Sequence, residues 1–107
     1  MQGYVSEIIR CDKLLDEAQE DEDLYKVIEC YRRIVIPEKN VRIRLSVLMM
    51  ICKTYLKLEN ITKGDFITTK SLLGHCEVMA LKDGNKKNLA HIQQMVRLLK
   101  QREEEVL

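Results

Sequence analysis

The sequence has no tryptophan, one phenylalanine, one proline and four glycines in 107 residues. With so few aromatic side chains, leucine, isoleucine, valine and methionine must fill the core, which suits helices packed side by side. The low proline and glycine content excludes a collagen-like or disordered chain. Hydrophobic residues make up 46% and charged residues 33% of the sequence, as expected of a charged, helix-rich soluble domain with one core.

The sequence also lacks an excess of charge, a signal peptide and a membrane-spanning run. With 18 basic and 17 acidic residues the net charge is +1, so no overall field favours nucleic acid or a membrane surface. Residues 1–10 contain neither a basic region nor an unbroken apolar run. The longest apolar stretch is interrupted by Arg42, Arg44 and Lys53. We therefore expect a soluble, intracellular protein that binds neither membranes nor, directly, nucleic acid.

The four cysteines, Cys11, Cys30, Cys52 and Cys76, are far apart in sequence and form no C-x-x-C pair. Each falls on an apolar position of an expected helix. This placement favours reduced, structural thiols in a reducing compartment, with a disulfide or a metal site as the alternatives.

The apolar stretch Val41–Leu58 is the part of the sequence around which the rest is organised. Within it, Leu45–Cys52 is apolar at nearly every position, so a helix would present apolar groups in almost every direction. A helix of this kind needs neighbours on all sides. We predict that it is the central helix of a small bundle.

The flanking segments repeat apolar residues every three to four positions, as amphipathic helices do. Pro37 ends the second helix, and Asn40 is suited to cap the central one. Thr62 and Asp65 have the outline of a capping box. The expected helices are residues 4–19, 24–35 and 41–58, a short helix carrying residues 66–67 that breaks at 69–71, and helices at 72–81 and 86–99.

The predicted fold is all-α, a compact five- to six-helix bundle around a buried central helix. Residues 1–107 form a single domain, in which residues 1–40 are an N-terminal helical hairpin, 41–100 the core and 101–107 a frayed tail. The run Ile34-Val35-Ile36 favours a strand on propensity alone. Gly74 costs its helix about 0.5–1 kcal/mol relative to alanine, which a closely passing backbone would explain.

No segment carries the constellation of an enzyme or a metal site. His75 and Cys76 are adjacent, so on a helix their side chains diverge by about 100° and cannot share one metal ion. Cys76 falls where its helix needs a small apolar residue, which favours a core thiol over a nucleophile. Gly64, Gly74 and Gly84 lack the spacing of a phosphate-binding loop. We expect no catalytic, cofactor-binding or metal-binding residues, and no cofactor.

A pattern of short motifs runs through residues 61–100: Ile61-Thr62, Thr69-Lys70, Leu73-Gly74, Val78, Leu81-Lys82, the turn Asp83–Asn85, and a last helix from Leu89-Ala90 to Leu99-Lys100. This pattern resembles the N-terminal domain of transcription elongation factor S-II, which several RNA polymerase II elongation proteins and a Mediator subunit share. It departs from the family in having extra residues before Leu73 and before Val78, and leucine in place of a tryptophan near its end. The helices before Val41 resemble the longer members, including the elongation factor that partners a histone chaperone.

The resemblance implies a nuclear, non-enzymatic protein–protein interaction module of a transcription elongation factor. In that family the domain binds short disordered motifs, acidic with aromatic anchors, of other transcription proteins or a histone chaperone. We expect a monomer with a groove between the central helix and residues 66–82. Tyr55, Phe66 and Leu73 are its expected lining, and Lys70 or Lys82 its rim. The alternative is a structural or homo-oligomerising bundle, whose very apolar central helix is completed by another chain.

Overall fold

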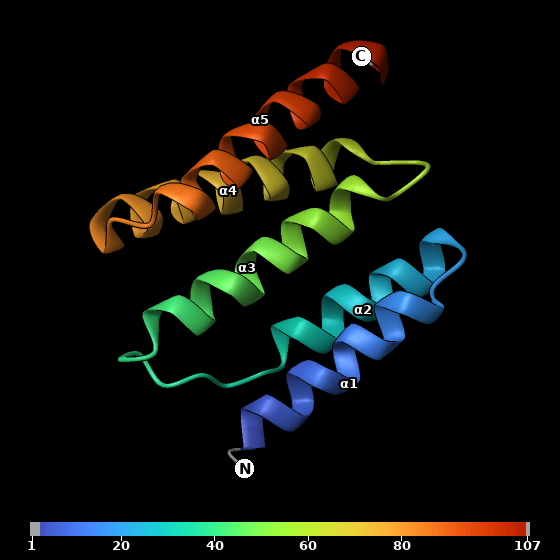
Figure 1. The fold of residues 1–107 in the computed structure, drawn as a ribbon. Coiled ribbons are helices and arrows are strands. Elements are labelled where there is room, and N and C mark those ends of the chain that lie inside the picture. Colours follow the sequence, from blue (N-terminus) through green and yellow to red (C-terminus); the bar gives the residue numbers. More distant parts are fainter. Residues whose placement is uncertain (1–2, 107) are drawn as a thin grey trace.

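The computed structural model describes residues 3–106, whose regular structure is entirely α-helical. In Figure 1, one helix lies between two helical pairs. This helix, α3, contacts α2, α4 and α5. The predicted all-α helical bundle is therefore confirmed. The helices are α1 (Gly3–Glu17), α2 (Asp21–Arg32), α3 (Val41–Leu56), α4 (Lys63–Asp83) and α5 (Lys86–Val106).

A disulfide joins α1 to α2, between Cys11 and Cys30, whose Cα atoms are 5.7 Å apart. The prediction of reduced thiols is therefore wrong for this pair. The two cysteines are 19 residues apart, but they lie at similar distances from the turn between α1 and α2. An antiparallel helical hairpin brings such positions together. Cys52 and Cys76 are free and buried, as predicted.

The acidic run after α1 begins α2, because Asp21–Asp23 occupy its first turn and complement the helix dipole. The Asp23 carboxylate accepts hydrogen bonds from the backbone amides of Gln19 and Glu20, which lower the pKa of Asp23. The Asp21 carboxylate instead accepts from the amides of Glu59 and Asn60, at 2.8 and 2.9 Å. It thereby attaches the loop between α3 and α4 to the start of α2.

Helix α2 ends at Arg32, although the sequence predicts that it continues through Val35. Pro37 disfavours helical geometry at the residue before it, and the β-branched residues 34–36 have low helix propensity. No strand forms among residues 3–106. Residues 34–36 form an irregular linker in which Val35 is 84% exposed.

Helix α4 is continuous, and the predicted break at residues 69–71 is wrong. The predicted capping box at its start is present, with Asp65 N donating to Thr62 Oγ1 at 3.1 Å and Thr62 N donating to Asp65 Oδ2 at 3.0 Å. The Thr69 hydroxyl donates to the Asp65 carbonyl one turn earlier, at 2.7 Å. Thr69 therefore satisfies its polar group inside the helix and does not cap a new one.

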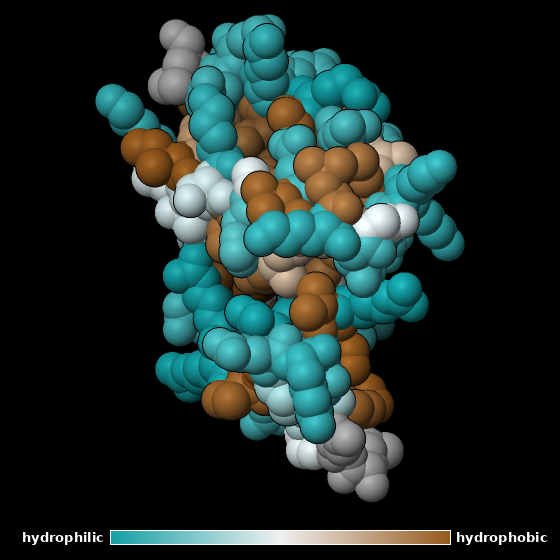
Figure 2. Space-filling model, turned by 90° about the vertical axis from the view of Figure 1, so that its left-hand side faces the viewer, coloured by the Kyte–Doolittle hydropathy of each residue, from teal (hydrophilic) through white to brown (hydrophobic). Residues whose placement is uncertain are grey.

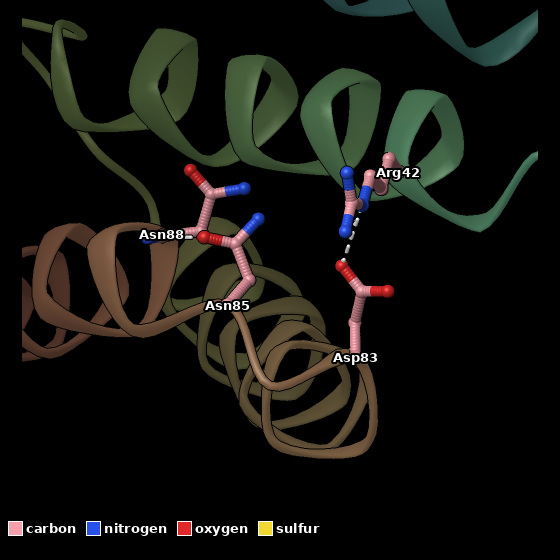
Figure 3. Close-up of polar contacts among 4 residues, drawn as sticks. All are labelled: Arg42, Asp83, Asn85 and Asn88. Carbon is pink, nitrogen blue, oxygen red and sulfur yellow. Dashed lines mark hydrogen bonds and ion pairs between the residues drawn. The ribbon is translucent and has the colours of Figure 1, made fainter.

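Helices α4 and α5 meet at a tight turn. Gly84 adopts a left-handed conformation with φ of 66° just after the end of the helix, a position that favours glycine. The Asn85 side chain then accepts a hydrogen bond from Asn88 N at 3.1 Å (Figure 3). On the other side of the turn, the Asp83 carboxylate accepts from Arg42 Nε at 3.1 Å (Figure 3). This ion pair connects the end of α4 to the start of α3.

Helix α5 continues to Val106, through the residues that the sequence assigns to a frayed tail. The extension is held by Arg102, whose guanidinium donates to the backbone carbonyls of Leu56 and Glu59, at 2.9 and 3.2 Å. Leu56 is the last residue of α3, so Arg102 satisfies a carbonyl that the helix leaves without an internal partner.

The apolar stretch of α3 is only partly enclosed by its neighbours. Leu45, Val47, Ile51 and Cys52 are buried in the core, whereas residues 48–50 are half-buried. The sequence predicts neighbours on every side of this stretch. That prediction is wrong for residues 48–50, and the exposed parts of these side chains line surface grooves.

Candidate functional site

The residues predicted to form the binding site are divided between the core and the surface. Tyr55, Phe66 and Leu73 are 6%, 2% and 1% exposed, so they belong to the core and present almost no area to a partner. Lys70 and Lys82 are exposed. They lie 12 positions apart on α4 and line separate hollows, one against α5 and one against the start of α3. The structure therefore does not bring the five residues into one groove.

Tyr55 is held by α2. Its hydroxyl accepts a hydrogen bond from Arg32 at 2.9 Å, and the Arg32 guanidinium carbon lies 5.9 Å from the centre of the ring. Burial raises the pKa of Tyr55 above its usual value. These contacts make Tyr55 part of the α2–α3 interface.

A surface groove with a largely apolar lining lies between α3 and α5 and has a volume of about 540 Å³. Its apolar lining consists of Met49, Met50, Leu56, Met95 and Leu98. Leu98 is 44% exposed, and the three methionines are half-buried. Methionine side chains are flexible and polarisable, so such a lining adapts to ligands of different shape. We call this region the α3–α5 groove.

The polar side chains around the α3–α5 groove carry only positive or neutral groups. Lys53 on α3 and Lys57, just after the last residue of α3, are exposed, while His91 and Gln94 lie on α5. No carboxylate lines the groove, and among residues 3–106 neither lysine forms an ion pair. The rim of the α3–α5 groove is therefore available to an acidic ligand.

A second hollow lies on the other side of these lysines, between α1 and α3, with a volume of about 450 Å³. It shares Met50, Lys53 and Lys57 with the α3–α5 groove, but Asp12 and Asp16 of α1 also line it. Asp12 accepts a hydrogen bond from the Tyr31 hydroxyl. The carboxylates on α1 make this hollow less favourable for an acidic ligand than the α3–α5 groove.

Cys52, Cys76 and His75 do not line the α3–α5 groove. Cys52 and Cys76 are fully buried, and their thiols share a hydrogen bond that, together with burial, raises the pKa of Cys52. His75 is exposed on α4, because adjacent helical positions point about 100° apart and Cys76 points into the core. Within the described part of the chain, no three histidine, cysteine or acidic side chains lie close enough to hold a metal ion.

The apolar periodicity of the sequence assigns the methionines of the α3–α5 groove to the core. Met49 and Met50 belong to the central apolar stretch, and Met95 to the apolar face of the last helix. The sequence carries one signal for a groove, namely three methionines and two lysines on segments predicted to pack together. Periodicity cannot separate this arrangement from a closed core, because both need apolar residues at the same positions.

In comparisons with known proteins, no protein family matches the chain, and no curated protein or solved structure gives a significant match. Among the helices that the structure describes, none is both long and apolar enough to cross a membrane.

Proposed function

We propose that this protein is a non-enzymatic protein–protein interaction module of a transcription elongation factor. It acts in the nucleus and binds short disordered motifs of other elongation proteins or a histone chaperone. The observation that carries this proposal is the α3–α5 groove, an apolar, methionine-rich hollow with a cationic rim on a rigid helical bundle. The transcriptional setting comes from the resemblance of residues 61–100 to the elongation factor S-II domain.

The ligand proposed for the α3–α5 groove is an acidic segment with bulky apolar anchors. Its anchors would pack on Met49, Met95 and Leu98, where burying apolar area contributes about 25 cal/mol per Å². Its carboxylates would lie near Lys53 and Lys57. Charge complementarity of this kind raises the association rate and orients the ligand.

A nuclear location has a consequence for α1. Disulfides are rare in the nucleus, which is a reducing compartment. In the nucleus Cys11 and Cys30 would therefore be two free thiols that lie close together in space. The hairpin would then depend on its apolar contacts and on the hydrogen bonds of Tyr31 with Asp12 and of Asn40 with Tyr4. The α3–α5 groove contains no residue of α1 and would remain formed.

Binding can be tested with fluorescently labelled acidic peptides that contain aromatic anchors, taken from disordered segments of transcription elongation proteins. We expect fluorescence anisotropy to show dissociation constants below about 1 mM, the range of weak motif recognition. The double variant Lys53→Glu/Lys57→Glu should slow association by about tenfold or more and weaken its dependence on salt. If no peptide binds at millimolar concentration, the proposal is wrong.

A matched control uses the two lysines that the sequence places at the rim. Lys70→Glu/Lys82→Glu changes the net charge by the same amount but lies outside the α3–α5 groove. We expect it to leave the peptide affinity within about threefold of the unmodified protein. If this variant abolishes binding and the α3 variant does not, the binding site lies on α4.

A further inference from the structure

Helix α4 carries an apolar seam on the face that points away from the core. Residues 67, 71, 74, 78 and 81 follow one another at spacings of four, three, four and three, the repeat with which one helix packs against another. Ile67, Val78 and Leu81 in this series are 63%, 49% and 63% exposed. Ser71 and Gly74 are also exposed. We call this set the α4 seam.

The α4 seam is separate from the contacts that hold α4 in the bundle. The buried residues of the helix, Phe66, Thr69, Leu73, Cys76, Met79 and Ala80, lie on its opposite side. An amphipathic surface helix normally has a polar outer face. Helix α4 instead has apolar residues on both faces, and within the described chain those of the outer face stay about half or more exposed, with Gly74 at the edge of the hollow between α4 and α5.

The smallest residues of the α4 seam lie at its centre. Apart from the neighbouring residues and backbone of α4 itself, no heavy atom lies within 4 Å of the position that a Cβ would take on Gly74, so the expected close backbone neighbour is absent among residues 3–106. A mid-helix glycine reduces helix stability, and packing of the described chain does not offset that cost. A glycine beside a serine does, however, allow the backbone of another helix to approach closely.

The sequence of the α4 seam is complementary to itself in the antiparallel direction. With Gly74 on a two-fold axis, Ile67 of one copy meets Leu81 of the other, because both are seven residues from the centre. Ser71, three residues before the centre, then lies close to Val78, four residues after it, so a small side chain faces a larger one, while Gly74 faces Gly74. A two-fold interface uses the same surface on both copies and requires this kind of self-complementarity.

The charges beside the α4 seam match the same arrangement. Lys70 lies four residues before Gly74 and Glu77 three residues after it, on the same flank of the helix. In the antiparallel pair, Lys70 of each copy faces Glu77 of the other, which gives two symmetrical ion pairs. In the single chain Lys70 has only a long contact with Glu103, at 4.0 Å.

We propose that two copies of this chain associate through the α4 seam as an antiparallel, two-fold symmetric dimer. The α3–α5 groove contains no residue of α4. The dimer therefore neither requires nor blocks the peptide binding proposed above. A single pair of crossing helices buries less area than a standard stable interface. We therefore expect a weak dimer, with a dissociation constant between about 10 μM and 1 mM.

Sedimentation equilibrium from micromolar to millimolar concentration tests this proposal. The unmodified protein should show a reversible rise in mass towards two chains, and Val78→Glu should weaken association at least about tenfold. Ile9→Glu is the matched control, because Ile9 is an apolar residue on α1 with 56% exposure. It should leave association unchanged. A strictly monomeric protein at millimolar concentration, or equal effects of the two variants, would overturn the proposal.

The antiparallel register is tested by exchanging charges and by cross-linking. Lys70→Glu and Glu77→Lys should each weaken the dimer, and the double variant should restore it. Under mild oxidation Gly74→Cys should form a disulfide between two chains. Ser71→Cys should not, because its copies would be displaced by about 9 Å along the axes, beyond disulfide reach. A failure of the double variant to restore association would show that the register is wrong, even if the protein dimerises.

Discussion

Gly74 and Gly84 are both in or beside α4, but the structure requires a glycine at only one of them. At Gly74 a Cβ would meet no heavy atom within 4 Å, whereas Gly84 has a φ of 66°. We predict that Gly74→Ala raises the free energy of unfolding by about 0.5–1 kcal/mol, because alanine has the higher helix propensity. Urea unfolding at low micromolar concentration, where the chain is monomeric, measures this change.

Gly84→Ala provides the control for that measurement. Alanine in a left-handed conformation is strained, so this variant should lose about 1 kcal/mol. A stability loss in Gly74→Ala of similar size would mean that position 74 is packed in the folded chain, contrary to the structure.

At the scale of the elements, one side chain joins the ends of two helices. Arg102 of α5 donates to the carbonyl of Leu56, the last residue of α3, and to the carbonyl of Glu59 in the loop that follows. These carbonyls lie at or after the end of α3, where the helix offers no backbone amide to bond them. Hydrogen bonds from a charged donor contribute about 1.5–3 kcal/mol when partly buried. We predict that Arg102→Ala lowers the free energy of unfolding by about 1–2 kcal/mol. Arg97→Ala, at an exposed position of the same helix, should change it by less than about 0.5 kcal/mol.

The helices could be predicted where their signals are local. The capping box of Thr62 and Asp65 depends on neighbouring residues alone and is present as predicted. The break at residues 69–71 was wrong, because Thr69 is buried and bonds to its own helix. The extension of α5 also lacked a local signal. It depends on Arg102 reaching α3, a contact between residues 46 positions apart.

The candidate site was harder to predict than the fold. Tyr55, Phe66 and Leu73 were chosen as groove residues, but they are the side chains that hold α3 and α4 in the core. Met49 and Met95 were assigned to the core but line the α3–α5 groove. Whether an apolar residue is covered depends on how closely two helices approach. Apolar periodicity gives the direction of a side chain and not that distance.

At the scale of the whole molecule, the Cys11–Cys30 disulfide links α1 to α2 and closes a loop between cysteines that are 19 residues apart. Closing a loop of this size lowers the entropy of the unfolded chain by an amount worth about 3 kcal/mol. We predict that Cys11→Ser/Cys30→Ser lowers the free energy of unfolding by about 2–4 kcal/mol in urea without reductant. In dithiothreitol, which reduces the disulfide, the free energy of unfolding of the unmodified protein should fall towards that of the variant. A difference that persists fully in reductant would come from packing and not from the bond.

The order of contacts along the chain also determines how the molecule assembles. The main helix pairs in contact are α1 with α2, α2 with α3, α3 with α4 and α4 with α5. Helix α3 also packs against α5. Each helix can therefore dock on the one synthesised just before it. Domains dominated by such local contacts fold in microseconds to milliseconds, far faster than a ribosome adds the next helix. The bundle can thus form progressively during translation, and its last step is the arrival of α5, which both closes the core and creates the groove against α3.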